Sequence, residues 1–219
     1  YDDFGNLTAS WFTTLDGTHR SVSNVYDNLE PDWQIGLLRQ RSVVVGIPGQ
    51  LPPPRVTSYD YDDLGRLRKT TRAPGDPELW QATIFRLTSK GLVDKITRSG
   101  AGASSRHVYF AYDDEGVFPR ASWNDLAHYA RVVHHPALGV AVLREDPNGV
   151  RVSATFDGFG RIRSQAPDDG MVTSWSYGSD ERASPGIATG TSVRQDQEDG
   201  YSASTYYDEW ERAWEYDST

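Results

Sequence analysis

Residues 61–70 read YDDLGRLRKT and contain the pattern that decides the fold of this chain. An aromatic residue precedes an aspartate, two variable residues follow, and a glycine and a basic residue complete the unit. Residues 156–164 repeat the unit as FDGFGRIRS, and residues 1–5 repeat most of it as YDDFG. In a tight turn, the aspartate accepts a backbone hydrogen bond and the glycine takes the left-handed conformation that closes a hairpin. Each unit therefore predicts the tip of a β-hairpin.

The Asp-x-x-Gly spacing occurs at five places, and we expect its residues to have structural roles in turns. The aromatic residue before the aspartate ends the incoming strand, and the residue after the glycine begins the outgoing strand. The predicted turn residues are Tyr1, Asp2, Gly5, Tyr61, Asp62, Gly65, Arg66, Tyr112, Asp113, Gly116, Asp146, Gly149, Phe156, Asp157, Gly160 and Arg161.

The composition predicts an all-β chain of successive antiparallel hairpins. Among 219 residues there are 12 tyrosines and 7 tryptophans but one methionine, together with 20 glycines and 12 prolines. Aromatic residues favour half-buried pleated surfaces, and glycine and proline favour the turns between them. The chain is long enough to bury a core in one large domain or two small ones.

The composition also argues against several functional classes. Without cysteine there is no disulfide framework, no thiolate metal site and no cysteine nucleophile. The net charge of −9 argues against a nucleic-acid partner, and no apolar run is long enough to span a bilayer. We therefore expect neither nucleic acid binding nor a membrane-spanning segment.

Turn signals from Gly116 to Gly170 follow one another at intervals of about 10 to 12 residues, as expected for a meander of short strands. Two strands and two turns make a repeat of about 21 residues, which lies in the range of repeat architectures. An ordinary β-sandwich spaces its turns similarly, so both architectures are compatible with the interval.

Three stretches resemble the RHS/YD-repeat family, namely residues 26–44, residues 61–77 and above all the block from Tyr112 to Gly170. That family includes bacterial RHS polymorphic toxins, the shell-forming BC components of insecticidal toxin complexes, and the YD shell of teneurins. The resemblance implies that residues 1–219 form one curled sheet of hairpins, excerpted from a much larger shell.

The same resemblance implies a non-catalytic wall that encapsulates a C-terminal toxin or effector for delivery. Its partners would be the remainder of its own shell and the enclosed effector domain, and its location would be secreted or on the cell surface. An alternative is an extracellular adhesion scaffold that binds glycans or a surface protein. Both functions require the same hairpins, so the sequence leaves them open.

Two segments interrupt the predicted hairpins. Residues 48–55 read PGQLPPPR, and three consecutive prolines cannot donate hydrogen bonds to a strand ladder, which predicts a proline-rich loop. Residues 178–200 contain a run of small and polar residues that predicts a loop-rich segment.

Two local conformations also follow from the pattern. Residues 26–39 predict a strand pair with a buried Trp33 and a turn at Gly36, and a short helical turn around Trp33 is the alternative. At the Asn124–Ala127 turn, alanine stands where the family that the chain resembles usually has glycine. Because a positive φ is unfavourable without glycine, we expect a different turn geometry there.

No combination of residues predicts catalysis, a cofactor or a metal site, so we expect a protein that is not an enzyme. His134 and His135 are adjacent on a predicted strand, so their side chains point to opposite faces and are poorly placed to chelate one ion. The paired acidic residues fall at turns that already explain them. The tryptophans are expected to pack within the wall rather than to stack on sugars, namely Trp11, Trp80, Trp123, Trp175, Trp210 and Trp214.

Overall fold

The computed structural model describes residues 1–47, 49–179, 191–207 and 213–218. These residues form 17 β-strands and one short 3-10 turn, which confirms the predicted all-β class. The chain divides into two compact units. Unit 1 comprises Tyr1–Phe110 and Asn124–Leu126, and unit 2 comprises Ala111–Trp123 and Ala127–Thr219.

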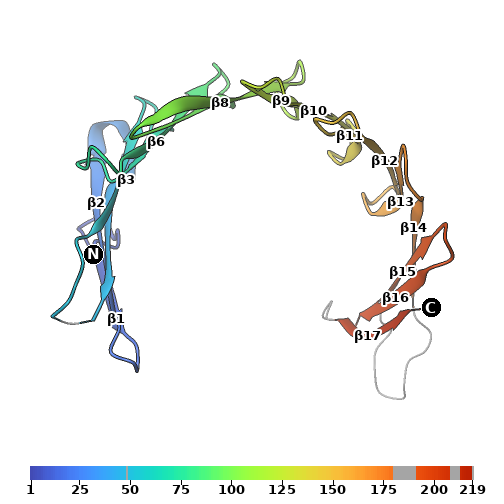
Figure 1. Cartoon of the computed structure of the whole chain (residues 1–219), viewed down its shortest axis with the longest axis horizontal. Coiled ribbons are helices and arrows are strands. Elements are labelled where there is room, and N and C mark those ends of the chain that lie inside the picture. The colour runs from blue at the N-terminus through green and yellow to red at the C-terminus, as the bar shows by residue number, and fades with distance from the viewer. Residues whose placement is uncertain (48, 180–190, 208–212, 219) are drawn as a thin grey trace. The chain divides into compact units, whose positions relative to one another are not determined.

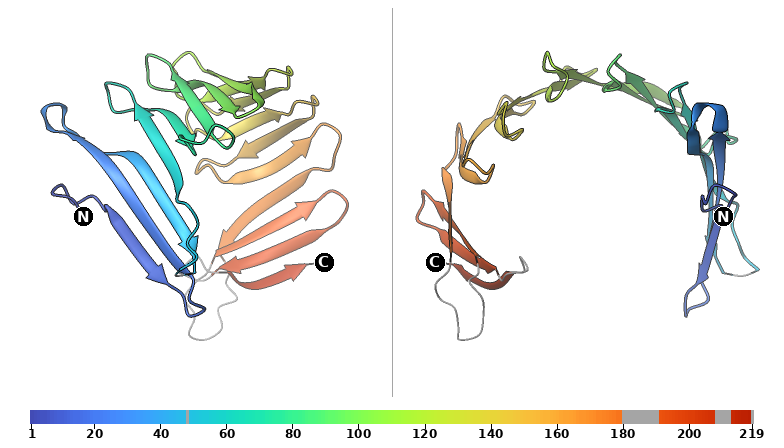
Figure 2. Two further views of the ribbon diagram at one scale, coloured as in Figure 1. Left: turned by 60° about the vertical axis from the view of Figure 1, so that its left-hand side comes forward. Right: turned by 180° about the vertical axis from the view of Figure 1, so that it is seen from behind.

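In unit 1, each strand pairs antiparallel with the next strand along the chain, and Figures 1 and 2 show these neighbours side by side. The 3-10 turn η1 (Glu30–Asp32) connects its second and third strands. The strands are β1 (Ala9–Thr13), β2 (His19–Leu29), β3 (Gln34–Gly46), β4 (Arg55–Tyr61), β5 (Leu67–Arg72), β6 (Gln81–Leu87), β7 (Val93–Gly100) and β8 (Ala103–Tyr112), the last of which extends into unit 2.

Unit 2 follows the same rule, since its strands pair antiparallel in chain order. The predicted succession of antiparallel hairpins is thus present in both units. The strands are β9 (Pro119–Asn124), β10 (Tyr129–His134), β11 (Ala141–Glu145), β12 (Arg151–Phe156), β13 (Ile162–Pro167), β14 (Thr173–Ser179), β15 (Thr191–Gln197), β16 (Ser202–Tyr207) and β17 (Ala213–Ser218).

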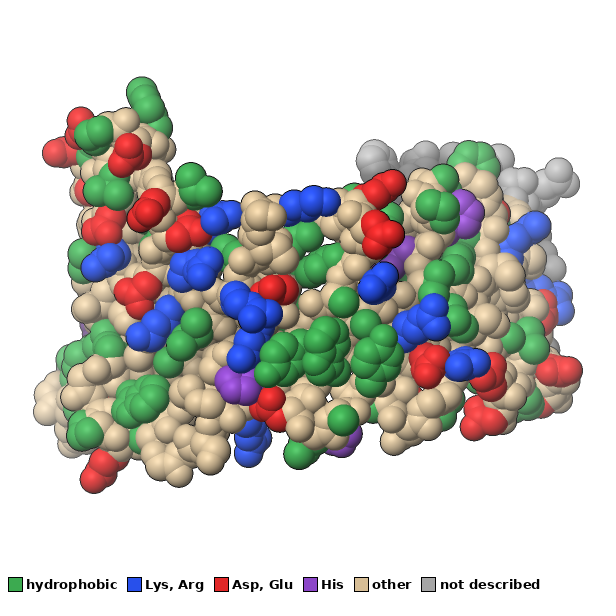
Figure 3. Space-filling model, turned by 90° about the horizontal axis from the view of Figure 1, so that it is seen from above, with side chains coloured by type: hydrophobic (Ala, Val, Ile, Leu, Met, Phe, Trp, Pro, Cys, Tyr) green, Lys and Arg blue, Asp and Glu red, His purple; other side chains and the backbone are tan. Residues whose placement is uncertain are grey.

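The buried core is very small. Among the described residues, the buried apolar side chains are those of Val22, Ala82, Ala121 and Ala203, and no large side chain is fully buried. Figure 3 shows hydrophobic, basic and acidic side chains intermixed on the surface that it displays. A sheet normally buries one face against a second layer. In the described residues, the contacts that hold the strands together are mainly the backbone hydrogen bonds between them and the hydrogen bonds at the hairpin tips.

The β2–β3 hairpin differs from its prediction. Trp33 is 88% exposed rather than buried, and it takes a left-handed φ of 52° directly after η1. Its N–H donates to the carbonyl of Glu30 at 3.2 Å, so the turn ends at Trp33. Gly36 also has a positive φ, of 76°, but it lies inside β3, where the register shifts between β2 and β3. The turn therefore lies before Gly36, because η1 reverses the chain in place of a glycine turn.

The Asn124–Ala127 turn also differs from its prediction. Ala127 takes a positive φ of 58°, which is the left-handed conformation that favours glycine. The side chain of Asn124 compensates in part, because its Oδ1 accepts the N–H of Leu126 at 3.0 Å. Alanine carries the smallest side chain that has a Cβ, so the left-handed conformation is strained here but possible.

The two predicted loop segments have different outcomes. Residues 49–54 contain no strand, and Gln50 forms an isolated bridge with Ile47 before β4 begins at Arg55. The segment 178–200 is less irregular than predicted, because β15 occupies Thr191–Gln197 and pairs with both β14 and β16. The residues 180–190 of that segment lie outside the described residues.

The strain at Ala127 predicts that Ala127→Gly stabilises the chain. Glycine adopts the observed φ without a Cβ clash, although it also makes the unfolded chain more flexible. We expect a net gain of up to about 1 kcal/mol, which corresponds to a rise in Tm of about 2–4 °C for a chain of this size. Thermal unfolding followed by circular dichroism measures it.

Ala154→Gly is the matched control, because Ala154 lies inside β12 in an extended conformation. Glycine in a strand interior destabilises by about 0.5–1 kcal/mol relative to alanine. A fall in Tm for both variants would contradict the assignment of strain to Ala127.

Candidate functional site: the hairpin tips

The tip at Asp62 joins β4 and β5 and shows how the repeated unit closes a hairpin. The N–H of Gly65 donates to the carbonyl of Asp62 at 2.9 Å, and the N–H of Asp62 donates to the carbonyl of Arg66, also at 2.9 Å. Gly65 has a φ of 70°. These bonds form a tight turn followed by a left-handed glycine, which is a common three-residue hairpin connection.

The carboxylate of Asp62 is satisfied within its own hairpin. Its Oδ1 accepts the N–H of Leu64 at 3.1 Å and that of Arg66 at 2.9 Å. Its Oδ2 accepts both Nε and Nη2 of Arg66 at 2.8 Å. The aspartate therefore caps the turn and anchors the first residue of the outgoing chain.

Asp157 repeats these contacts between β12 and β13. Its Oδ1 accepts the N–H groups of Phe159 and Arg161 at 2.9 and 3.0 Å, and its Oδ2 accepts Nε of Arg161 at 2.7 Å. The guanidinium of Arg161 also lies over the ring of Tyr177 on β14, 4.5 Å from its centroid. This tip thus reaches a strand beyond its own hairpin.

The other three predicted tips share the turn but not the arginine. The glycine N–H donates to the aspartate carbonyl at 3.0 Å in the tips at Asp2, Asp113 and Asp146. Asp2 Oδ2 accepts the amide nitrogens of Asn6 and Asn28, at 2.9 and 3.1 Å, in place of a guanidinium. Because each tip closes its own turn, the structure does not gather the acidic residues into a common site.

The aromatic residue before the aspartate has no single role. Tyr61 is half-buried, and its hydroxyl donates to the carbonyl of Leu38 on β3 at 3.1 Å. Burial raises the pKa of Tyr61. Phe156 lacks a hydroxyl, and Tyr1 is 84% exposed. Tyr61 therefore links its tip to a neighbouring strand by a contact that Phe156 cannot make.

Neighbouring tips also touch one another through their glycines. A Cβ placed on Gly65 would lie 3.4 Å from Oε1 of Gln34, the first residue of β3, whose Nε2 donates to the carbonyl of Asp63 at 2.6 Å. A Cβ on Gly91 would lie 3.3 Å from Nη1 of Arg66. In unit 2, a Cβ on Gly139 would lie 3.2 Å from the ring of Phe118. The residue that follows one tip thus packs against the glycine of the next.

Three tips that the Asp-x-x-Gly spacing does not predict use the same backbone ring without the leading aspartate. The N–H of Gly17 donates to the carbonyl of Thr14 at 3.0 Å, and that of Gly200 donates to the carbonyl of Gln197 at 3.1 Å. Thr88 and Gly91 form a third such turn at 3.0 Å. In all three turns, the glycine has a positive φ and lies three residues after a polar residue.

The histidine pair has structural contacts. His134 stacks on Phe118 with ring centroids 5.0 Å apart, and Nδ1 of His135 accepts the N–H groups of Ala137 and Leu138 at 3.3 and 3.2 Å. Within the described ranges, no three histidine, aspartate or glutamate side chains form a group able to hold a metal ion. None of the helical residues described forms a span long and apolar enough to cross a membrane.

The tryptophans divide between the wall and the solvent. Trp80, Trp123 and Trp175 are half-buried, as expected for wall residues. Trp11 is 74% exposed, so wall packing is wrong for this residue. The side chains of Trp210 and Trp214 lie outside the described residues.

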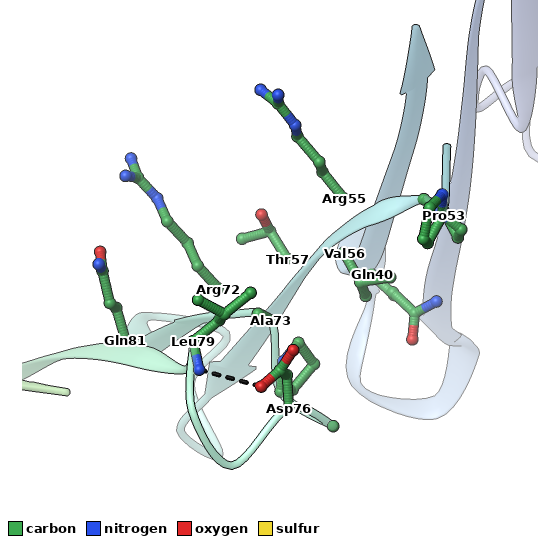
Figure 4. A pocket seen from close by; sticks show the side chains of 13 residues that line it. Gln40, Pro53, Arg55, Val56, Thr57, Arg72, Ala73, Asp76, Leu79 and Gln81 are labelled. Atoms are coloured by element: carbon green, nitrogen blue, oxygen red, sulfur yellow. Dashed lines mark hydrogen bonds between the residues drawn. The ribbon is translucent and has the colours of Figure 1, made fainter. Parts of the chain in front are cut away.

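An open depression of about 910 Å³ lies beside β4 and β5 in unit 1 (Figure 4). Its lining includes Pro53, Arg55, Arg72 and Leu79. Asp76 is held in the β5–β6 loop, where its Oδ1 accepts the N–H groups of Glu78 and Leu79 at 2.8 and 3.0 Å. Asp76 is the only carboxylate among the residues that line the depression.

Comparisons with known proteins identify no family, since no family model and no curated protein matches the sequence. Among solved structures, the chain is similar to a porin-like protein from Bacteroides uniformis, with 13% identity and a TM-score of 0.37 over 96% of this chain and 95% of that one. It is also similar to a TcdB2–TccC3–TEV structure, with 11% identity and a TM-score of 0.23 over 96% of this chain.

A third similar structure is a Photorhabdus luminescens Tc holotoxin pore with a substituted TccC3, at 9% identity and a TM-score of 0.25 over 92% of this chain. The chain covers 17% and 19% of the two toxin-complex chains. At TM-scores this low, the three likenesses assign neither a function nor a partner.

The left-handed glycines predict that Gly160→Val destabilises the chain. Gly160 has a φ of 78°, which costs a residue with a side chain about 1–2 kcal/mol. For a chain of this size, that corresponds to a fall in Tm of about 2–8 °C. We expect the same direction for Gly65→Val, and thermal unfolding measures both.

Gly158 provides the control within the same turn. It has no positive φ, and a Cβ placed on it would meet nothing within 4 Å. Gly158→Val should therefore change Tm much less than Gly160→Val. If Gly65→Val and Gly160→Val both left Tm unchanged, these glycines would not be the left-handed residues that the turns require.

The capping carboxylate predicts a pH dependence of stability. The hydrogen bond from the side chain of Arg66 and those from the backbone lower the pKa of Asp62. In the unfolded chain the pKa of an aspartate is about 3.9. The stabilisation is therefore fully present above that value and is lost as the pH falls through the lower pKa of the folded state.

We expect Asp62→Asn to lower Tm at pH 7. We expect the difference in Tm between this variant and the unmodified chain to shrink as the pH falls from 4 to 2. The side chain of the adjacent Asp63 is exposed and has no hydrogen bond or ion pair among the described residues, so Asp63→Asn serves as the control. A difference that stays constant across this pH range would show that the carboxylate charge of Asp62 does not stabilise the tip.

Proposed function

We propose that this chain is a non-catalytic structural segment of a secreted or surface shell that encloses a C-terminal toxin or effector of the same protein. The observation that carries the proposal is the near absence of a buried core. In the described residues, the buried apolar side chains are few and small, as expected for a thin wall rather than for a globular domain. The resemblance of the repeated turns to the RHS/YD family supplies the enclosing role.

The strand order supports this proposal. In each unit, every described strand register joins strands that are consecutive along the chain. Such a meander gives each internal strand two neighbours and leaves free ladder groups only at its ends. The remainder of the shell would continue the sheet at those ends, so that a large surface is built from one simple element.

The exposed hydrophobic side chains also suit an enclosing role. Exposed hydrophobic side chains are scattered over many strands and turns, including Phe12, Ile84 and Phe159. Scattered apolar groups among charged ones provide weak contacts with many sequences, without the shape complementarity of a specific interface. An enclosed effector would be retained by the walls rather than by a tight binding site.

A second function, an adhesion scaffold that binds glycans, is favoured by Trp11. This side chain is 74% exposed on β1 and stacks against His19 on β2, with ring centroids 6.3 Å apart and an angle of 27° between the planes. An exposed and supported aromatic ring is suited to stacking on a sugar face.

Limited proteolysis of the natively purified parent protein, read by mass spectrometry, tests the shell. If the repeats enclose an effector, a fragment that follows them should survive in the native sample and disappear from a denatured control. The protease should cut exposed loops in both samples, which gives an internal control for its activity.

A parent protein in which no fragment after the repeats is selectively protected, or which has no effector after them, would contradict enclosure. In that case, the next measurement compares the glycan affinity of the unmodified chain with that of the Trp11→Ala variant. Binding that depends on Trp11 would support the adhesion scaffold.

A further inference from the structure

Unit 1 carries five exposed arginines on one face of its strands. The strand registers place Arg41 opposite Thr57, and Thr57 opposite Arg72. Directly paired residues of antiparallel strands point to the same face. Arg55 is two residues before Thr57 and therefore shares that face. We call the set the arginine band, namely Arg41, Arg55, Arg72, Arg98 and Arg106.

The band continues across the neighbouring strands. Arg72 lies opposite Gln81 on β6, and Thr83, two residues further along β6, lies opposite Arg98 on β7. Arg98 lies opposite Arg106 on β8. The band therefore crosses the strands from β3 to β8.

Figure 4 shows part of this face at close range. The side chains of Arg55, Thr57, Arg72 and Gln81 extend to one side of the strands, whereas Asp76 lies on the other side. Asp76, the acidic side chain that lines this pocket, is thus directed away from the guanidinium groups of Arg55 and Arg72.

The arginines of the band have no ion pair among the described residues, which distinguishes them from others in the unit. Arg39, Arg66 and Arg86 each pair with an aspartate, at 3.3, 2.8 and 2.7 Å. The band thus forms a local positive surface on a chain whose net charge is −9.

One pair in the band opposes the stability of the sheet. Arg98 and Arg106 are direct cross-strand neighbours, and like charges in that position are destabilising. Local choices that work against the fold are typical of positions that serve binding. An anion bound between the two guanidinium groups would remove the repulsion.

We infer that the arginine band binds a linear anionic polysaccharide that carries sulfate or carboxylate groups. Guanidinium groups bind both anions through two parallel hydrogen bonds. Adjacent strands are about 4.8 Å apart, so Arg41 and Arg72, two strands apart, present charges at intervals of about 10 Å. Thr57, Gln81 and Thr83 lie between the arginines and supply hydroxyl and amide groups for sugar hydroxyls.

A linear polymer suits this surface better than a small ligand does. The five side chains are exposed and spread over several strands, and Arg55 and Arg72 line an open depression rather than an enclosed cavity. A nucleic acid would gain most from a series of aromatic rings between the charges, and the residues between these arginines are threonine and glutamine. An acidic polypeptide is the remaining polyanion, and it forms a separate outcome of the test.

The test measures binding of the 219-residue chain to heparin fragments of defined length by isothermal calorimetry at several salt concentrations. The matched probes are desulfated heparin, dextran, polyglutamate and single-stranded DNA. We expect heparin to bind most tightly, dextran not to bind, and the affinity to fall as salt rises because counterions are released.

The test variant combines Arg41→Gln, Arg72→Gln and Arg98→Gln. We expect at least a tenfold loss of heparin affinity and a shallower dependence on salt. The control combines Arg120→Gln, Arg144→Gln and Arg163→Gln, which remove the same charge from exposed positions in unit 2. We expect the control to retain most of the affinity.

Equal losses in the two triple variants would overturn the inference, because net charge alone would then govern binding. Tighter binding of polyglutamate or DNA than of heparin would overturn the choice of ligand, and absence of heparin binding would overturn the site. Thermal unfolding of both triple variants shows whether each is folded at the temperature of the binding assay, so that lost binding is not attributed to unfolding. Arg98→Gln alone should keep or raise Tm by relieving the repulsion from Arg106, and a lower Tm would contradict that repulsion. None of these outcomes depends on whether the wall encloses an effector.

Discussion

The closed ring of hydrogen bonds at the Asp-x-x-Gly hairpin tips is the constraint on which the rest of this structure depends. At Asp62, one side chain accepts two backbone N–H groups and a guanidinium, while Gly65 supplies the only backbone conformation that lets the chain return after so short a turn. The ring fixes where each strand ends. Because side chains alternate along a strand, it thereby also fixes which face every following residue occupies.

The sheet and the hairpin tips complement each other. With few buried side chains in the described residues, the sheet gains little from a hydrophobic core. Contacts between successive tips, such as Gln34 with Gly65 and Arg66 with Gly91, hold neighbouring hairpins together along one end of the strands. The glycine thus has two roles, since it permits the turn and leaves room for the neighbouring side chain.

The sequence predicted what depends on a few adjacent residues. The all-β class and the positions of the Asp-x-x-Gly turns follow from local hydrogen bonding. A short helical turn around Trp33 is the alternative interpretation of residues 26–39, and η1 ends directly before Trp33, but the exposure of that side chain was not predicted. The positive φ of Ala127 was not predicted either, because it accompanies a side-chain contact of Asn124 that the pattern does not show. The arginine band could not be predicted either. It depends on cross-strand registers, and a bulge such as that between Asp60 and Tyr61 changes the residue that faces a given neighbour.

The pairing of consecutive strands has a consequence for how such a chain folds and changes over time. Contacts that are close in sequence lose little loop entropy when they form, so each hairpin can form early and serve as a template for the next. A duplicated or deleted hairpin pair would preserve the alternation of the strands and require no distant partner to change with it. Growth by whole hairpins is therefore an accessible route by which chains of this kind can change their length.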